Sequence, residues 1–265
     1  METFNDEACL FNMYRRWSLA QICFNGRWLA CFKIMMLTKP MLLQPFWVNN
    51  SGKNDPPPDF YSNKLKTMME FMRMDDCVEK IDGKHIANSF ERIAKIQRKV
   101  LNLKNDQPDL SFLLIDPDTS NPKEFNFKGY FDNFKRVVDK HSKHVGLYRK
   151  NHPQCKTTVF LIWDESGSYI QAQNEKDLQR YQQSGNLPAN FFPHQQFHDS
   201  VFLNILKNCS ADFVIWMCPY KSLIVDGKFL RYPSACICDI RRLIIPNAEH
   251  NHELMIRVNE RKGDS

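Results

Sequence analysis

Charged side chains that could act on a phosphoester follow three short apolar runs of the sequence. They are Asp116 and Asp118 after residues 110–115, Asp164 and Glu165 after residues 157–163, and Lys221 after residues 213–218. If the three runs are neighbouring parallel strands, these side chains meet at one edge of a sheet, where open α/β folds bind ligands. Converging carboxylates repel one another. A divalent cation with oxygen ligands offsets that repulsion and polarises a phosphoryl oxygen.

A second acidic set follows residues 64–74. Four apolar residues in this stretch recur at helical spacing, which predicts a helix: Leu65, Met68, Met69 and Met72. If the helix continues, Asp75 and Asp76 lie on the same stripe. Burying two unpaired carboxylates is costly, so either the helix ends by Met74 or both carboxylates have partners. With Glu79 and Lys80 nearby, the segment resembles the restriction-endonuclease-like core, and this resemblance implies acids from a helix and a hairpin that hold Mg²⁺.

Residues 113–119 (LLIDPDT) resemble the opening motif of the haloacid-dehalogenase-like phosphatases, a hydrophobic run followed by DxDxT. The resemblance implies a nucleophile at Asp116, a general acid/base at Asp118 and the family's lysine at Lys221. The chain departs from the family pattern where Asp164 follows the second run in place of Ser or Thr, and no acidic pair follows Lys221.

These patterns predict a hydrolase of phosphoesters or phosphodiesters that depends on Mg²⁺ or Mn²⁺ and is nuclease-like. The expected catalytic residues are Asp164, Glu165 and Lys221, because a lysine can stabilise charge that develops on a phosphate. The expected metal ligands are Asp75, Asp76 and Asp116. The partner would be a nucleic acid or a phosphorylated small molecule.

The charge of the chain keeps a second class open, a non-catalytic interaction or nucleic-acid-binding protein. Lysine and arginine number 36 against 30 acidic residues, which gives a net charge of +6 over 265 residues. Basic residues are densest between Arg92 and Lys104, in a predicted helix that Ser89 caps. Such a spread is typical of a solvated face, and it also fits a helix that contacts a polyanion.

Cysteine usage and the N-terminal residues predict a cytoplasmic protein. The nine cysteines have irregular spacing and form no CxxC, so reduced thiols are expected rather than a disulfide framework. Cys236 and Cys238 would point the same way from one strand. His141 lies in the apolar stripe of a predicted helix, where a hydrogen bond to a tyrosine or the backbone is expected. Residues 28–48 are interrupted by Lys and Pro, so no membrane span is expected.

The expected fold is α/β, with a mixed sheet of parallel core strands, a C-terminal antiparallel extension and an N-terminal helical segment. The breaker at residues 49–58 (NNSGKNDPPP) divides the chain into a helical segment (1–53), an α/β domain (54–258) and a polar tail (259–265). The predicted helices span residues 10–32, 64–74, 89–103, 130–148 and 199–209. Hairpins are expected around Asp82-Gly83 and Asp226-Gly227, strands at 235–240 and 254–258, and a polar loop at 167–193.

Three stretches resemble a group of uncharacterised bacterial proteins: PPDFY at 57–61, MMEFMRMDD at 68–76 and FLIWDES at 160–166. The likeness runs from about Pro57 to Val258. It implies a bacterial, cytoplasmic origin and places all three stretches in a single domain.

Overall fold

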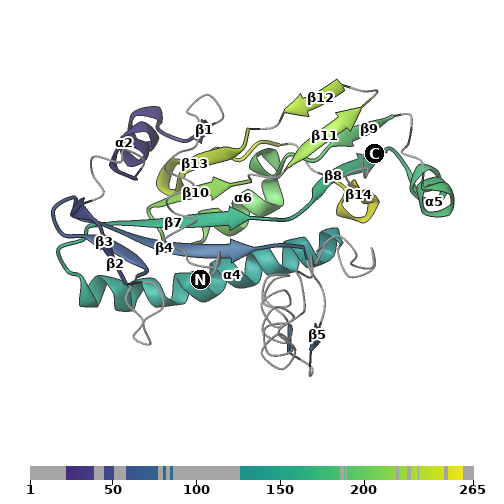
Figure 1. Cartoon of the computed structure of the whole chain (residues 1–265). Helices are drawn as coiled ribbons and strands as arrows, with labels where there is room; N and C mark the ends of the chain where they lie inside the picture. Colours follow the sequence, from purple (N-terminus) through teal and green to yellow (C-terminus); the bar gives the residue numbers. More distant parts are fainter. Residues whose placement is uncertain are drawn as a thin grey trace, which may run out of the picture.

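The computed structural model describes residues 22–38, 45–50, 58–76, 80–81, 84–85, 126–185, 188, 190–218, 221–225, 228–231, 233–247 and 250–258. A mixed sheet of seven strands in the order β1-β13-β10-β7-β4-β3-β2 forms the centre (Figure 1). Its strands are β1 (Ile22–Asn25), β2 (Val48–Asn49), β3 (Phe60–Ser62), β4 (Thr67–Met74), β7 (Thr157–Asp164), β10 (Phe213–Met217) and β13 (Ala235–Asp239).

The middle of this sheet is parallel and its flanks are mixed. β4, β7 and β10 run in the same direction, β13 is antiparallel to β10, and β3 and β2 add antiparallel strands beyond β4. β1 pairs in parallel with β13 at the opposite edge. The predicted mixed α/β fold with parallel core strands and a C-terminal antiparallel addition is therefore confirmed.

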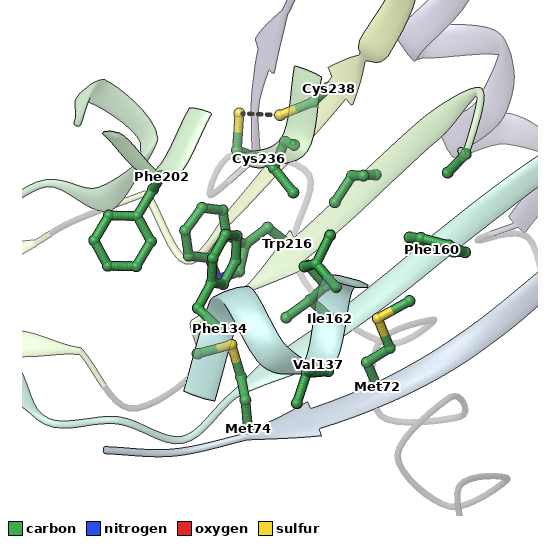
Figure 2. Close-up of a cluster of buried hydrophobic side chains, with 14 of the residues drawn as sticks. Met72, Met74, Phe134, Val137, Phe160, Ile162, Phe202, Trp216, Cys236 and Cys238 are labelled. Carbon is green, nitrogen blue, oxygen red and sulfur yellow. Dashed lines mark hydrogen bonds between the residues drawn. The ribbon is translucent and has the colours of Figure 1, made fainter. Parts of the chain in front are cut away.

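Helices cover both faces of the sheet. α4 (Phe127–Asn151) and α6 (Ser200–Lys207) pack on one face, and α2 (Trp28–Thr38) packs on the other. The predicted helices at 130–148 and 199–209 are confirmed. Asn126 starts α4 because its side chain accepts a hydrogen bond from the Gly129 amide, and Asp199 caps α6 in the same way. Figure 2 shows Phe134 stacked on Trp216 in the layer between α4 and the sheet, with ring centroids 4.5 Å apart.

The predicted helix over residues 64–74 is wrong, because this segment forms β4 and the turn that leads into it. Lys66 takes a left-handed backbone conformation, with φ of 50°, in the turn from β3. Met68, Met72 and Met74 face α4, while Met69 and Phe71 face α2. A strand buried on both faces is a continuous apolar run, and its methionines satisfy the helical spacing equally well.

The segment before residue 54 is not purely helical. Residues 22–25 form β1, inside the helix predicted at 10–32, and the helix begins only at Trp28. β2 also lies before the predicted boundary and pairs with β3. The described part of this segment thus contributes two strands to the central sheet.

The polar loop predicted over residues 167–193 is also wrong. It contains β8 (Ser168–Ala172), α5 (Glu175–Ser184) and β9 (Phe191–Pro193). β14 (Met255–Val258), β8 and β9 form an antiparallel sheet beyond the carboxyl end of β7 (Figure 1). The helix was missed because its apolar stripe is short: only Leu178 and Tyr181 pack on the small sheet, and none of its residues is fully buried.

Some of the remaining predicted elements are confirmed, and the others lie outside the described residues. β11 (Ser222–Val225) pairs with β12 (Lys228–Arg231), and β5 (Lys80–Ile81) pairs with β6 (Lys84–His85), which confirms both hairpins. The strands predicted at 235–240 and 254–258 correspond to β13 and β14. The strand predicted at 110–115, the helix predicted at 89–103, Asp116 and Asp118 lie outside the described residues. In the part of the chain that is described, no helix is long and apolar enough to cross a membrane.

Candidate functional site

The three parallel strands bring charged side chains to one edge of the sheet. These are Asp75 and Asp76 after β4, Asp164 and Glu165 at the end of β7, and Lys221 after β10. Met74 at the end of β4 is the register partner of Asp164, so the two strands end side by side. The structure thus unites Asp164 and Glu165 with Asp75 and Asp76, which the sequence placed in separate segments, because Asp75 and Asp76 follow a strand rather than a helix.

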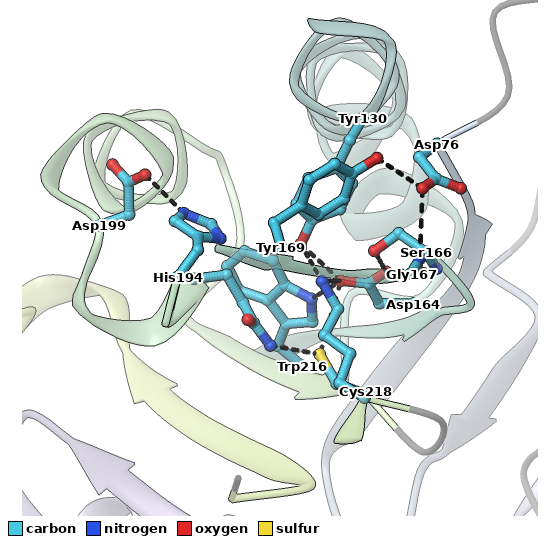
Figure 3. A network of polar contacts seen from close by, with 12 residues as sticks. Asp76, Tyr130, Asp164, Ser166, Gly167, Tyr169, His194, Asp199, Trp216 and Cys218 are labelled. Atoms are coloured by element: carbon cyan, nitrogen blue, oxygen red, sulfur yellow. Dashed lines mark hydrogen bonds and ion pairs between the residues drawn. The ribbon is translucent and has the colours of Figure 1, made fainter. Parts of the chain in front are cut away.

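Asp164 is fully buried, and both of its carboxylate oxygens have several partners. Oδ1 accepts hydrogen bonds from the Ser166 hydroxyl at 2.5 Å and the Ser166 amide at 3.0 Å. Oδ2 has four partners: the Tyr130 hydroxyl at 2.7 Å, Trp216 Nε1 at 3.0 Å, Cys218 Sγ at 3.5 Å and Lys221 Nζ at 3.6 Å. A buried carboxylate with this many donors is held in one orientation (Figure 3).

Tyr130 and Lys221 donate to Asp164 from the same side of this cluster. Lys221 Nζ lies 3.1 Å from the Tyr130 hydroxyl and 4.2 Å from the centre of its ring. Burial and the Asp164 charge raise the pKa of Tyr130 well above its usual range, so the phenol stays protonated. Tyr130 therefore donates to Asp164 and accepts from Lys221. Only 5% of the Lys221 side chain is exposed.

Asp76 forms a second buried centre, and only one of its oxygens has partners. Oδ2 accepts from the Tyr169 hydroxyl at 2.5 Å, from Arg257 Nε at 2.9 Å and from the Gly167 amide at 3.3 Å. Oδ1 is buried and has no hydrogen-bond partner among the described residues. Gly167 leaves room for the Arg257 guanidinium, since a β-carbon there would lie 2.7 Å from Arg257 Nε.

Glu165 is held by a cation and an indole at the same edge. Arg73 donates from Nε and NH2 to its two oxygens at 2.6 and 2.8 Å, and Trp163 Nε1 donates at 3.1 Å. Burial raises the pKa of Glu165 to about 7, aided by the nearby Asp75 charge and opposed by Arg73. A carboxyl group with that pKa can take up and release a proton near neutral pH.

A histidine–aspartate cluster lies beside these two centres. Asp199 Oδ2 is 2.8 Å from His194 Nε2 and 2.9 Å from His252 Nε2. Burial lowers the pKa of His194 to about 4 despite the Asp199 charge, so its ring is neutral at pH 7. Because Nε2 carries the ring proton and donates it in the hydrogen bond to Asp199, Nδ1 is an acceptor. Nδ1 is buried without a partner among the described residues.

Another predicted candidate, His141, lies away from this edge. His141 Nδ1 is 2.6 Å from Glu70 Oε1, and the Tyr148 hydroxyl donates to the same oxygen at 2.9 Å. Glu70 is buried in the middle of β4 under α4. The expected contact to a tyrosine or the backbone is thus replaced by one to a glutamate, which itself binds a tyrosine.

Several members of the site could not be predicted from the sequence, because their partners lie on distant segments. They are Tyr130, Tyr169, Arg257, His194 and Asp199. The exception is a local signal at Asp199, which is five residues after His194 and precedes a helix.

The described residues contain no group of three or more His, Cys, Asp or Glu side chains arranged to hold a metal ion by themselves. The expected ligand Asp116 is not among these residues.

Comparison with known proteins adds no assignment. No family model matches the chain, and no match was found among the curated proteins or the solved structures.

Proposed function

We propose that the edge formed by the carboxyl ends of β4, β7 and β10 is the active site of a divalent-cation-dependent phosphoester hydrolase, nuclease-like in its chemistry. The observation that carries this proposal is the free oxygen of Asp76. Oδ1 is buried without a partner in the described part of the chain, whereas Oδ2 has three donors. A buried acceptor left unpaired costs about 1–3 kcal/mol, and a carboxylate oxygen is a preferred ligand of Mg²⁺ and Mn²⁺.

The charges at the edge support a bound cation. Among the residues that the structure describes, four carboxylates lie at this edge with three basic side chains: Asp75, Asp76, Asp164 and Glu165 with Arg73, Arg257 and Lys221. An excess of buried negative charge is unfavourable unless a cation or a proton offsets it. Arg257 binds Oδ2 of Asp76, so a metal ion could bind Oδ1 without displacing it. Asp75 and Asp116 are the further proposed ligands.

The proposed roles follow from the contacts of each residue. The cation, held by Asp76, would polarise a phosphoryl oxygen. Lys221 would stabilise the charge that develops on the phosphate, and Glu165, with a pKa of about 7, would take a proton from the attacking water. Because Asp164 already accepts hydrogen bonds on both oxygens, it acts as a positioning residue that orients Tyr130 and Lys221.

Calorimetric titration with Mg²⁺ and with Mn²⁺ tests the cation site. The wild type and Asp132→Asn should bind the ion, while Asp76→Asn should lose at least tenfold in affinity. Asp132 is the matched control because its side chain is 54% exposed and pairs with Lys128 in α4. Absence of binding by the wild type, or equal binding by Asp76→Asn, would overturn the proposal.

Hydrolysis of a nitrophenyl phosphate monoester and of the matching diester tests the reaction class. Activity that requires the cation and falls at least 100-fold in Lys221→Met would support the assignment, since removing one donor to a transition-state charge has that size of effect. Lys128→Met, on the exposed face of α4, is the control. A protein that binds a nucleic-acid duplex with steep salt dependence and hydrolyses neither ester would instead be the non-catalytic binding protein.

The proposed location is the cytoplasm. The seven cysteines that the structure describes are free thiols, which fits a reducing compartment.

A further inference from the structure

A group of thiols gathers on the last two strands of the large sheet, β13 and β1, which lie beyond β10. Cys23 in β1 and Cys236 in β13 are register partners in adjacent parallel strands. Neighbouring strands lie about 4.8 Å apart, within the range of about 4.4–6.8 Å that separates the Cα atoms of disulfide-bonded cysteines. Both side chains face the α4 and α6 layer, so they point to the same side of the sheet.

A third sulfur lies in contact with this pair. Cys238 is two residues after Cys236 on β13, so the two side chains project to the same face. Their sulfur atoms are 3.8 Å apart, a contact of two reduced thiols rather than a bond (Figure 2). This confirms the expectation that Cys236 and Cys238 point the same way.

The three thiols differ in accessibility and in acidity. Cys23 is half-buried, whereas Cys236 and Cys238 are 1% and 0% exposed. A hydrogen bond from Cys236 lowers the pKa of Cys23 below its usual value, although burial opposes this. The contacts with Cys23 and Cys238, together with burial, raise the pKa of Cys236. Cys23 is therefore the more nucleophilic thiol, because the thiolate is the reactive form.

We propose that Cys23 and Cys236 are a peroxide-reactive thiol pair that closes reversibly into a disulfide between β1 and β13. In the first step the Cys23 thiolate attacks a peroxide oxygen, the O–O bond breaks, and Cys23 becomes a sulfenic acid while hydroxide leaves. In the second step the Cys236 sulfur attacks the Cys23 sulfur, the S–O bond breaks, and water leaves with the Cys236 proton. The peroxide takes up two electrons overall, both from Cys23 in the first step, and the second step shares this oxidation equally between the two sulfurs. A thiol reductant reverses the disulfide.

The position of β1 gives this bond a structural effect. β1 is the terminal strand of the sheet and pairs only with β13 among the described strands. α2, which covers one face of the sheet, begins three residues after β1 ends. A disulfide at this register would tie the edge strand, and the helix that follows it, to the sheet.

Peptide mapping under non-reducing conditions after treatment with hydrogen peroxide tests the proposal on the wild-type chain, so no variant has to fold. The expected product has lost two hydrogen atoms, links the peptides of Cys23 and Cys236, and returns to the dithiol with dithiothreitol. A linkage between Cys236 and Cys238, or oxidation of Cys23 to a sulfinic acid without a link, would overturn it.

Variants then separate the roles of the sulfurs. Cys23→Ser should abolish the cross-link, whereas Cys238→Ser should retain it. Cys155→Ser, which removes a buried thiol beside the β3–β4 turn, is the control and should behave as the wild type. Failure of Cys238→Ser to form the bond would contradict the direct reaction of Cys23 with Cys236.

Discussion

The rings of Tyr130 and Tyr169 stack with their centroids 5.8 Å apart and their planes 8° apart, and each hydroxyl donates to a different buried carboxylate. Tyr130 donates to Asp164, and Tyr169 donates to Asp76. The stacked pair thus joins the two centres of the candidate site through a rigid aromatic contact. Movement of one ring would disturb the hydrogen bonds of both carboxylates.

Removing either hydroxyl should destabilise the fold. Tyr130→Phe and Tyr169→Phe should each lower the free energy of unfolding by about 1–3 kcal/mol, because a buried carboxylate loses a donor that nothing replaces. Urea unfolding measures this, and the double variant gives the coupling between the two sites. Tyr61→Phe, at a half-buried ring tilted against His152, is the control. Values within about 0.5 kcal/mol of the wild type for both variants would contradict the described contacts.

Gly167 should be sensitive to a single added methyl group. In Gly167→Ala the β-carbon would meet the Arg257 guanidinium at 2.7 Å, so Arg257 must leave Asp76. Arg257 is partly exposed and can turn to water, so the expected loss is about 1–3 kcal/mol in unfolding free energy rather than a failure to fold. Under the proposed function, cation affinity changes as well.

Gly146→Ala is the matched control for this change. It lies in α4 with nothing within 4 Å of the added carbon, and it should raise stability by up to about 1 kcal/mol through helix propensity. Equal effects of the two substitutions would show that Arg257 does not pack on Gly167.

Burial of neutral His194 should make a contribution to the free energy of unfolding that is lost in acid. Its pKa is about 4 when folded and about 6.5 in the unfolded chain, so below pH 6.5 the unfolded state binds a proton that the folded state excludes. This contribution to stability is present above pH 6.5 and is lost as pH falls towards 4, at up to about 1.4 kcal/mol per pH unit. His194→Gln should remove this contribution and leave the opposite pH dependence of Glu165, whereas His198→Gln, at an exposed ring in the same segment, should follow the wild type. Urea unfolding from pH 4 to 7.5 measures both slopes.

The sequence predicted the part of the site that depends on strand ends. The apolar runs before Asp164 and Lys221 are short and unmistakable, so the rule for parallel sheets placed these residues correctly at one edge. Met68, Met69 and Met72 misled the prediction because methionine favours helices and their spacing fits both structures. Arg257 could not be found at all. It reaches Asp76 across 181 residues of sequence, and no local pattern encodes such a contact.

Glu165 should change stability with pH in the direction opposite to His194. Its pKa is about 7 when folded and about 4.5 when unfolded, so the folded state holds the proton more tightly. The stability it contributes is complete below pH 4.5 and is lost as pH rises through 7. Between about pH 4.5 and 6.5 the two groups therefore change stability in opposite directions, and the wild type should be nearly flat with respect to these two groups.

Glu165→Gln removes the Glu165 contribution to the pH dependence of stability. The variant should gain stability with rising pH over that window, at up to about 1.4 kcal/mol per unit, because only the His194 contribution remains. Glu253→Gln, at an exposed carboxylate before β14, is the control and should follow the wild type. If Glu165→Gln instead follows the wild-type curve, Arg73 holds Glu165 ionised throughout, and the proposed base would have to be another group at this edge. Combining Glu165→Gln with His194→Gln should restore a flat curve, which separates proton uptake at these two side chains from general acid unfolding.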